Sequence, residues 1–193
     1  MSAFTRIPAM FATAAANYES DTVYGILTAN AALADSVALF HSTHANLTGT
    51  GTVISVTSLG VARAMMRKQK TIKNVVMNLR PRYLIVPAAL ETIAAQYVSA
   101  NYVANQSSTI NPFAGAFEVI SEARLDDNSA TAWYLAADPS MIDTIEYCYL
   151  EGQNGVYIET RQGFDVDGME IKARLDFAAK AIDYRGLYKN VGA

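Results

Sequence analysis

The N-terminal part of the chain carries apolar side chains at helical spacing. Residues 8–30 are rich in alanine and predict one long helix, because Pro8 suits a first helical turn and apolar residues recur every three or four positions. Gly25 is a weak point within it. A helix of this length needs packing partners along its whole length, since packing supplies most helical stability in water. The predicted apolar stripe is Ile7, Phe11, Ala14, Tyr18 and Ile26.

The centre of the chain alternates helical and extended patterns. Residues 31–56 have no regular period and predict an irregular, partly exposed connection. We expect a second helix to open at Thr57 as its capping residue and to end in a basic turn. Residues 80–87 predict a buried strand bracketed by prolines. A third helix is expected over residues 88–100, and its inward side chains are Leu90, Ile93, Ala94 and Tyr97.

Short strands are predicted after a polar loop over residues 101–112. Residues 116–123 and 130–136 predict a hairpin whose turn is the polar stretch 126–129. Two further strands are expected at residues 145–150 and 156–160.

The clearest pattern lies near the C-terminus. Over residues 169–177, apolar and charged residues alternate with a period of two, after a turn at residues 165–168. This alternation predicts a strand with one buried side and one solvated or partner-facing side. The buried side is Met169, Ile171, Ala173, Leu175 and Phe177, and the other side is Glu170, Lys172, Arg174 and Asp176. Together with the helices, the pattern predicts an α+β fold in which helices cover a sheet.

Composition narrows the class of protein. The chain has 193 residues, of which 51% are hydrophobic and 17% charged, so it is not a disordered chain and has apolar surface to spare for subunit contacts. A net charge of −3 without a basic stripe argues against specific nucleic-acid recognition. The longest uncharged span, residues 36–62, is too polar to cross a bilayer, so we expect no membrane association.

Candidate chemistry is sparse. His41 and His44 have a metal-like spacing, but zinc takes three or four ligands and the pattern supplies no third, so we predict no metal site. Cys148 lies in an apolar run and is predicted to be a buried, inert thiol. Neither a serine-nucleophile elbow nor a phosphate-binding loop is present, and the acidic pairs near residues 126 and 165 suit turns. We therefore predict no catalytic residues, no cofactor and no enzymatic activity.

A set of segments along nearly the whole chain resembles the C-terminal part of tailed-phage major capsid proteins with the Hong Kong 97-type shell fold. The resemblance is to the branch sometimes encoded with a Clp-like prohead protease. The segments are residues 3–8, 19–21, 23–24, 39–41, His44 with Asn46, 84–87, 90–91, 133–135, 137–139, 163–168, 172–176, 183–186 and 189–190.

This resemblance implies an architecture. It implies a peripheral lobe with a long spine helix, over residues 1–35 and 139–193, and an axial lobe with a helix-covered sheet, over residues 36–138. Family members carry an N-terminal arm and an extended loop upstream of the spine helix. The chain starts just before that helix, so the resemblance implies a truncated form that lacks both.

The implied function is that of a structural shell subunit. Copies of the chain would form capsomers around packaged DNA, in the virion or in the bacterial cytoplasm when expressed from a prophage, with a scaffold or prohead protease as further partners. Two alternatives stay open: a Clp-like or prohead-type peptidase or a metal-dependent hydrolase using His41 and His44, and an encapsulin-type nanocompartment shell. The residues predicted to contact neighbouring subunits are Glu170, Lys172, Arg174, Asp176, Asp183 and Arg185.

Overall fold

The computed structural model describes residues 3–100, 111–163 and 168–193, and within them the chain is a mixed α+β protein with three α-helices and several sheets. The predicted loop over residues 101–112 and turn over residues 165–168 lie mostly outside the described residues. The elements are α1 (Ala3–Ala29), η1 (Ser42–His44), α2 (Val56–Arg67), β1 (Pro81–Val86), η2 (Ala88–Leu90), α3 (Glu91–Val98), β2 (Glu118–Ser121), η3 (Ala123–Leu125), β3 (Trp133–Ala137), β4 (Ile145–Tyr149), β5 (Tyr157–Gln162), β6 (Met169–Arg174), β7 (Phe177–Ala181) and β8 (Leu187–Asn190).

The chain divides into two compact units. Unit 1 comprises Met1–Ile26 and Glu146–Lys180, and unit 2 comprises Leu27–Ile145 and Ala181–Ala193. β8 pairs with β3 and therefore belongs to the sheet of unit 2.

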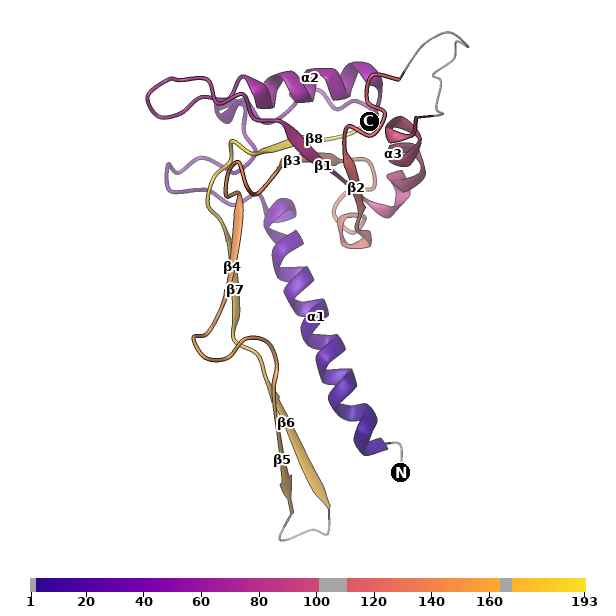
Figure 1. The fold of residues 1–193 in the computed structure, drawn as a ribbon, viewed down its shortest axis with the longest axis vertical. Helices are drawn as coiled ribbons and strands as arrows, with labels where there is room; N and C mark the ends of the chain where they lie inside the picture. The colour runs from indigo at the N-terminus through magenta and orange to yellow at the C-terminus, as the bar shows by residue number, and fades with distance from the viewer. Residues whose placement is uncertain (1–2, 101–110, 164–167) are drawn as a thin grey trace. The chain divides into compact units, whose positions relative to one another are not determined.

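Unit 2 is built on a four-stranded sheet with strand order β2-β1-β3-β8 (Figure 1). β1 is parallel to β2 and antiparallel to β3, and β3 is antiparallel to β8. The predicted hairpin of residues 116–123 and 130–136 is wrong, because β1 lies between the two strands. All five residues of β3 are buried, so this strand needs a neighbour on each side, and β1 and β8 supply them.

Helix α2 runs alongside this sheet (Figure 1) and supplies Leu59, Ala62 and Met66 to its core. The helix begins earlier than predicted, because Ser55 rather than Thr57 is its cap. The Ser55 hydroxyl accepts a hydrogen bond from the Ser58 N–H, and the Ser58 hydroxyl accepts one from the Ser55 N–H. This reciprocal arrangement satisfies two backbone donors that the helix itself leaves unpaired.

The third predicted helix is shorter than its pattern. It opens as the 3₁₀ turn η2 and ends at Val98, where Ser99 takes an extended conformation. Ala94 is buried and Leu90 and Tyr97 pack against the core, as predicted. Ile93 was expected to point inward but is 41% exposed, so the buried side of this helix is narrower than the sequence suggested.

The connection after α1 is irregular and partly exposed, as predicted, but it contains a few buried residues. Asn30 ends the helix in a left-handed conformation (φ 48°), and its side chain donates to the Phe40 carbonyl and accepts from the Phe40 N–H at 2.7 Å. Leu39 and Phe40 are 1% exposed. The Asn46 side chain is also buried and accepts from the His41 N–H while donating to the Leu39 carbonyl. Side-chain amides thus replace regular secondary structure in satisfying this backbone.

In unit 1 the helix α1 begins at Ala3, so Pro8 lies inside it rather than at its start. The helix continues through Gly25, and its predicted apolar stripe is only partly covered, since Tyr18 is 54% exposed. The alternating run at residues 169–177 is two strands rather than one: it breaks after Arg174, β6 pairs with β5, and β7 pairs with β4 (Figure 1).

Candidate subunit interface

The hairpin of β5 and β6 has a charged face. The register places Tyr157 opposite Arg174, Glu159 opposite Lys172, and Arg161 opposite Glu170. Alternation along each strand puts these six side chains, which we call the charged face, on the same side of the hairpin. Three of them, Glu170, Lys172 and Arg174, are predicted interface residues.

The charges on this face are paired within the chain. Arg161 donates from Nε and Nη2 to the same Glu170 oxygen, at 3.0 and 2.6 Å. The Lys172 ammonium lies 2.7 Å from a Glu159 carboxylate oxygen, and its hydrogen bond holds the pKa of Glu159 below its usual range. Because all four side chains are exposed, these ion pairs contribute little to the stability of the fold. They instead fix where each charge is presented.

Arg174 has a different set of partners. Its Nη2 donates to the Gln153 side-chain carbonyl at 2.6 Å, and its Nε lies 3.5 Å from an Asp176 carboxylate oxygen. The guanidinium also lies 5.5 Å from the centre of the Tyr157 ring. Asp176, another predicted interface residue, therefore joins the charged face through Arg174, although it lies just beyond the end of β6.

The last two predicted interface residues belong to unit 2. Arg185 donates from Nη1 to one Asp183 oxygen and from its backbone N–H to the other, each at 2.8 Å. Its guanidinium lies 5.2 Å from the centre of the Tyr184 ring. These contacts close a turn between β7 and β8, and both side chains are mostly covered. The six predicted residues therefore fall into two groups, one in each unit.

The opposite side of the β5–β6 hairpin is apolar at its centre. We call it the apolar face; its residues are Ile158, Thr160, Gln162, Met169, Ile171 and Ala173. The sequence predicted that Met169, Ile171 and Ala173 would be buried. Met169 is 46% exposed and Ala173 is also exposed, because the described residues place no second layer over this side of the two-stranded hairpin.

An aromatic cluster joins the other ribbon of unit 1 to α1. Tyr147, Tyr149 and Phe177 have ring centres 5.3–6.0 Å apart. With Glu19 and Val23 of α1 they line a shallow cavity of about 240 Å³. Partial desolvation and a hydrogen bond to the Glu19 carboxylate raise the pKa of Tyr149. The cluster packs the ribbon on the helix, and its groups suggest no reaction.

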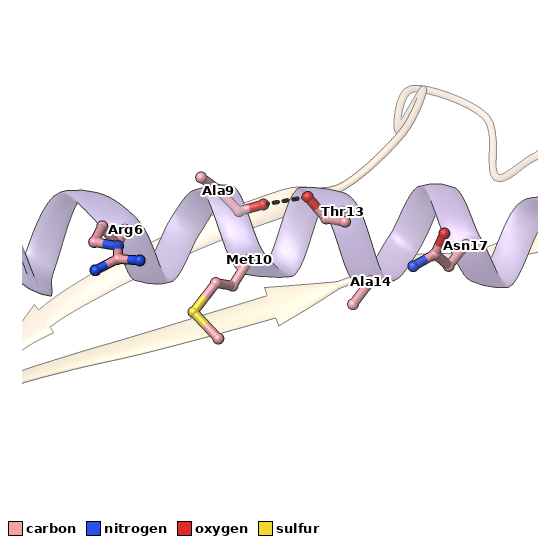
Figure 2. A pocket seen from close by; sticks show the side chains of 6 residues that line it. All are labelled: Arg6, Ala9, Met10, Thr13, Ala14 and Asn17. Carbon is pink, nitrogen blue, oxygen red and sulfur yellow. Dashed lines mark hydrogen bonds between the residues drawn. The ribbon is translucent and has the colours of Figure 1, made fainter.

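A second hollow follows the N-terminal half of α1 alone. Figure 2 shows Arg6, Met10, Ala14 and Asn17 along the helix, with the Thr13 hydroxyl donating to the Ala9 carbonyl at 3.0 Å. Met10 is 67% exposed. Since every lining residue comes from this one helix, the hollow is an uncovered helix surface rather than an enclosed pocket.

The two histidines considered for catalysis make hydrogen bonds and ring contacts within the fold. His44 is 4% exposed, its Nε2 is 2.8 Å from an Asp35 oxygen, and its ring stacks on Tyr184. His41 caps the η1 turn by accepting from the Thr43 N–H. No group of three or more histidine, cysteine or acidic side chains suited to a metal occurs among residues 3–100, 111–163 and 168–193.

Cys148 corrects a prediction. The sequence placed it in a buried strand, but its side chain is exposed, because β4 pairs with β7 alone in the described part of the chain. In the same part, no helix is long and apolar enough to span a membrane.

Sequence reasoning missed the charges on β5. Glu159 and Arg161 hold two of the predicted interface residues, yet neither was singled out, and the strand was expected to end at residue 160 rather than at Gln162. The same period-two alternation that marks β6 runs through β5, and matching the two charge patterns could have found the pairing.

Comparison with known proteins supplies the family. The model of a family described as "Phage capsid protein" matches residues 1–190. The chain therefore belongs to this phage capsid protein family, whose members are structural proteins of the bacteriophage capsid. Comparison with curated proteins finds no match, and neither does comparison with solved structures.

Proposed function

We propose that this capsid protein is a shell subunit with the Hong Kong 97-type fold, from the branch encoded with a Clp-like prohead protease. In this proposal α1 is the spine helix, unit 1 corresponds to the peripheral lobe predicted over residues 1–35 and 139–193, and unit 2 corresponds to the axial lobe predicted over residues 36–138. The family match and the mixed α+β architecture support it.

One observation carries the proposal. Unit 1 leaves large apolar side chains exposed on its helix and on both of its ribbons: Met10 is 67% exposed, Tyr147 59%, Leu150 54% and Met169 46%. Monomeric soluble proteins rarely gather apolar residues on their surface without a partner to cover them. In a shell, neighbouring copies supply that cover.

The mechanism is assembly rather than catalysis. Copies form pentamers and hexamers by head-to-tail contacts around a rotation axis, and these capsomers close a shell around packaged DNA. Individual contacts can be weak, because each subunit makes many of them at once. The partners are further copies, a scaffold and the prohead protease, and the assembled location is the virion.

The predicted interface residues have a defined part in this proposal. Glu170, Lys172, Arg174 and Asp176 present charges of both signs at fixed positions, and such a surface selects register between neighbours more than it adds affinity. Asp183 and Arg185 are held in a turn and present a smaller charged surface from unit 2.

Electron microscopy and sedimentation of the purified chain test the proposal. We expect capsomers or closed shells that accumulate as protein concentration rises. A chain that sediments as a monomer at all concentrations, with no particles in negative stain, contradicts the proposed function.

A further inference from the structure

We infer that the free edge of β6 pairs with the β6 of a second copy of the chain, in antiparallel orientation across a two-fold axis that passes beside Ile171. The two hairpins then form one continuous four-stranded sheet. This inference rests on the proposed function, because it names one of the contacts through which copies assemble.

The first step is the need for an additional strand. Within the residues that the structure describes, β5 and β6 form a sheet of two strands only. An isolated two-stranded hairpin is marginally stable in water, and each of its outer edges offers backbone groups to another strand. Neither strand contains a proline, which would remove a backbone donor from the edge.

The second step is the direction of the backbone groups. The Gly163 N–H donates to the Gly168 carbonyl at 2.8 Å, so these two residues form a hydrogen-bonded pair. Hydrogen-bonded and non-hydrogen-bonded pairs alternate along an antiparallel ladder. The residues of the charged face therefore bond across the hairpin. Those of the apolar face direct their backbone groups outward: Met169, Ile171 and Ala173 at the β6 edge, and Ile158, Thr160 and Gln162 at the β5 edge.

The third step is the register that charge allows. A second β6 must place outward backbone groups opposite outward groups, so neighbouring acceptable registers differ by two residues. Placing Ile171 opposite its own copy sets each Glu170 against the Lys172 of the other copy. A shift in one direction sets Lys172 against Lys172, and a shift in the other sets Glu170 against Glu170. Of these three registers, only the one centred on Ile171 avoids like charges opposite each other at these two positions.

This register also extends the ion pairs that already exist. Arg161 holds Glu170, and Glu159 holds Lys172 within each copy. One row of charged side chains then crosses the four strands in the order Arg161, Glu170, Lys172 of the second copy and Glu159 of the second copy. The two-fold axis generates an identical row that starts from the second copy. Charges of opposite sign are therefore neighbours at every step of both rows.

The apolar face decides between the two edges. At the β5 edge a two-fold centred on Thr160 would also set Glu159 against Arg161, so charge alone does not choose. However, the β5 edge presents Thr160 at its centre, flanked by Ile158 and Gln162, whereas the β6 edge presents Ile171, flanked by Met169 and Ala173. Pairing through β6 brings the two Ile171 side chains together and sets each Met169 against an Ala173, which covers apolar surface that a single chain exposes.

Disulfide trapping tests this geometry directly. In a Cys148→Ser background, Ile171→Cys places two thiols across the axis, where the Cα separation of a hydrogen-bonded pair, about 5.5 Å, suits a disulfide. The matched control is Thr160→Cys, because Thr160 lies directly opposite Ile171 in the same hairpin. We expect mild oxidation to convert most of the Ile171→Cys chain to a covalent dimer and to leave Thr160→Cys largely monomeric. Equal crosslinking of the two variants, or none, overturns the inference.

Proline variants supply a second measurement. Ile171→Pro and Thr160→Pro each remove an outward N–H and no bond of the hairpin itself, so they carry a similar local cost. We expect Ile171→Pro to weaken self-association at least about tenfold in sedimentation velocity, and Thr160→Pro to change it less than about threefold. If the original chain assembles and Ile171→Pro assembles equally well, the β6 contact is wrong and the proposed function stands. If the chain forms only a dimer that Ile171→Pro abolishes, the β6 contact holds and shell formation is wrong.

Discussion

Replacing Leu135 by alanine should destabilise unit 2 more than most single substitutions. Leu135 lies in the middle of β3, is 0% exposed, and is opposite Leu84 on one side and Tyr188 on the other. Both neighbours are themselves buried in the same core. The backbone of β3 is hydrogen-bonded on both sides, so the strand cannot easily shift to fill the space that the shorter side chain leaves.

The size of the effect follows from the lost contacts. Leucine to alanine removes three carbon atoms, which corresponds to about 2.4 kcal/mol of transfer free energy at roughly 0.8 kcal/mol per buried carbon. The residual cavity adds to this, so we expect a loss of about 3–4 kcal/mol. With a urea dependence of about 2 kcal/mol per molar, the unfolding midpoint should fall by about 1.5–2 M.

The chain supplies its own reporter for this measurement. Trp133 is the single tryptophan, is 0% exposed, and donates from its indole to the Thr52 carbonyl at 3.0 Å, so its fluorescence follows the core of unit 2. The control is Ile72→Ala, at a position 93% exposed, which should change stability by less than about 0.5 kcal/mol. A midpoint for Leu135→Ala that lies within about 0.3 M of the control would refute the assignment of β3 as a buried inner strand of the sheet.

Two further substitutions test the connection after α1 and an exposed ion pair. Asn30→Ala loses the side-chain bonds to Phe40 and leaves alanine, which disfavours the left-handed region more than asparagine does, at φ 48°, so the free energy of unfolding should fall by about 1–3 kcal/mol. Asn30→Gly loses the same bonds but has no Cβ to strain at this φ, so it should cost less. A hydrogen bond from the Ser140 N–H, with Arg82 beside it, lowers the pKa of Asp138 to about 2. Its contribution to stability is therefore complete above the ordinary carboxyl pKa near 3.8 and is lost as pH falls toward 2; in Asp138→Asn, the decline of the thermal midpoint over this range should be smaller.

Local patterns predicted the existence of most elements and missed several of their ends. The long helix, the buried strand at residues 80–87 and the C-terminal alternation are all present as ordered elements. The end of α1 at Ala29 agrees with the predicted end at residue 30, whereas its start at Ala3 lies five residues before the predicted start at Pro8. The start of α2 depends on the reciprocal bonds of Ser55 and Ser58, which the nearby Thr57 obscured.

Strand pairing was the largest failure, and the reason is physical. Residues 116–123 and 130–136 are close in sequence with a polar stretch between them, which favours a hairpin. β3 is buried along its whole length, so it pairs with the strands that bury it rather than with the strand closest in sequence. These strands are residues 81–86 and 187–190. Period-two alternation likewise runs without interruption through the break between β6 and β7, because the two strands keep the same phase while pairing with different partners.

For the candidate interface, too, the sequence pattern predicted the strand but not its partners. Alternation correctly separated a charged side of β6 from an apolar side, but it could not say that β5 would supply Arg161 and Glu159 as partners for the charges. Nor could it say that the apolar side would stay uncovered, because burial was assumed to come from the same chain. Under the proposed function that assumption fails, because part of the hydrophobic pattern would encode contacts with other copies. The apolar side chains of Met169 and Ile171 are partly exposed in a single chain but would be covered in a sheet formed by two copies. The trapped dimer at Ile171 distinguishes this explanation from a hairpin that remains open to water.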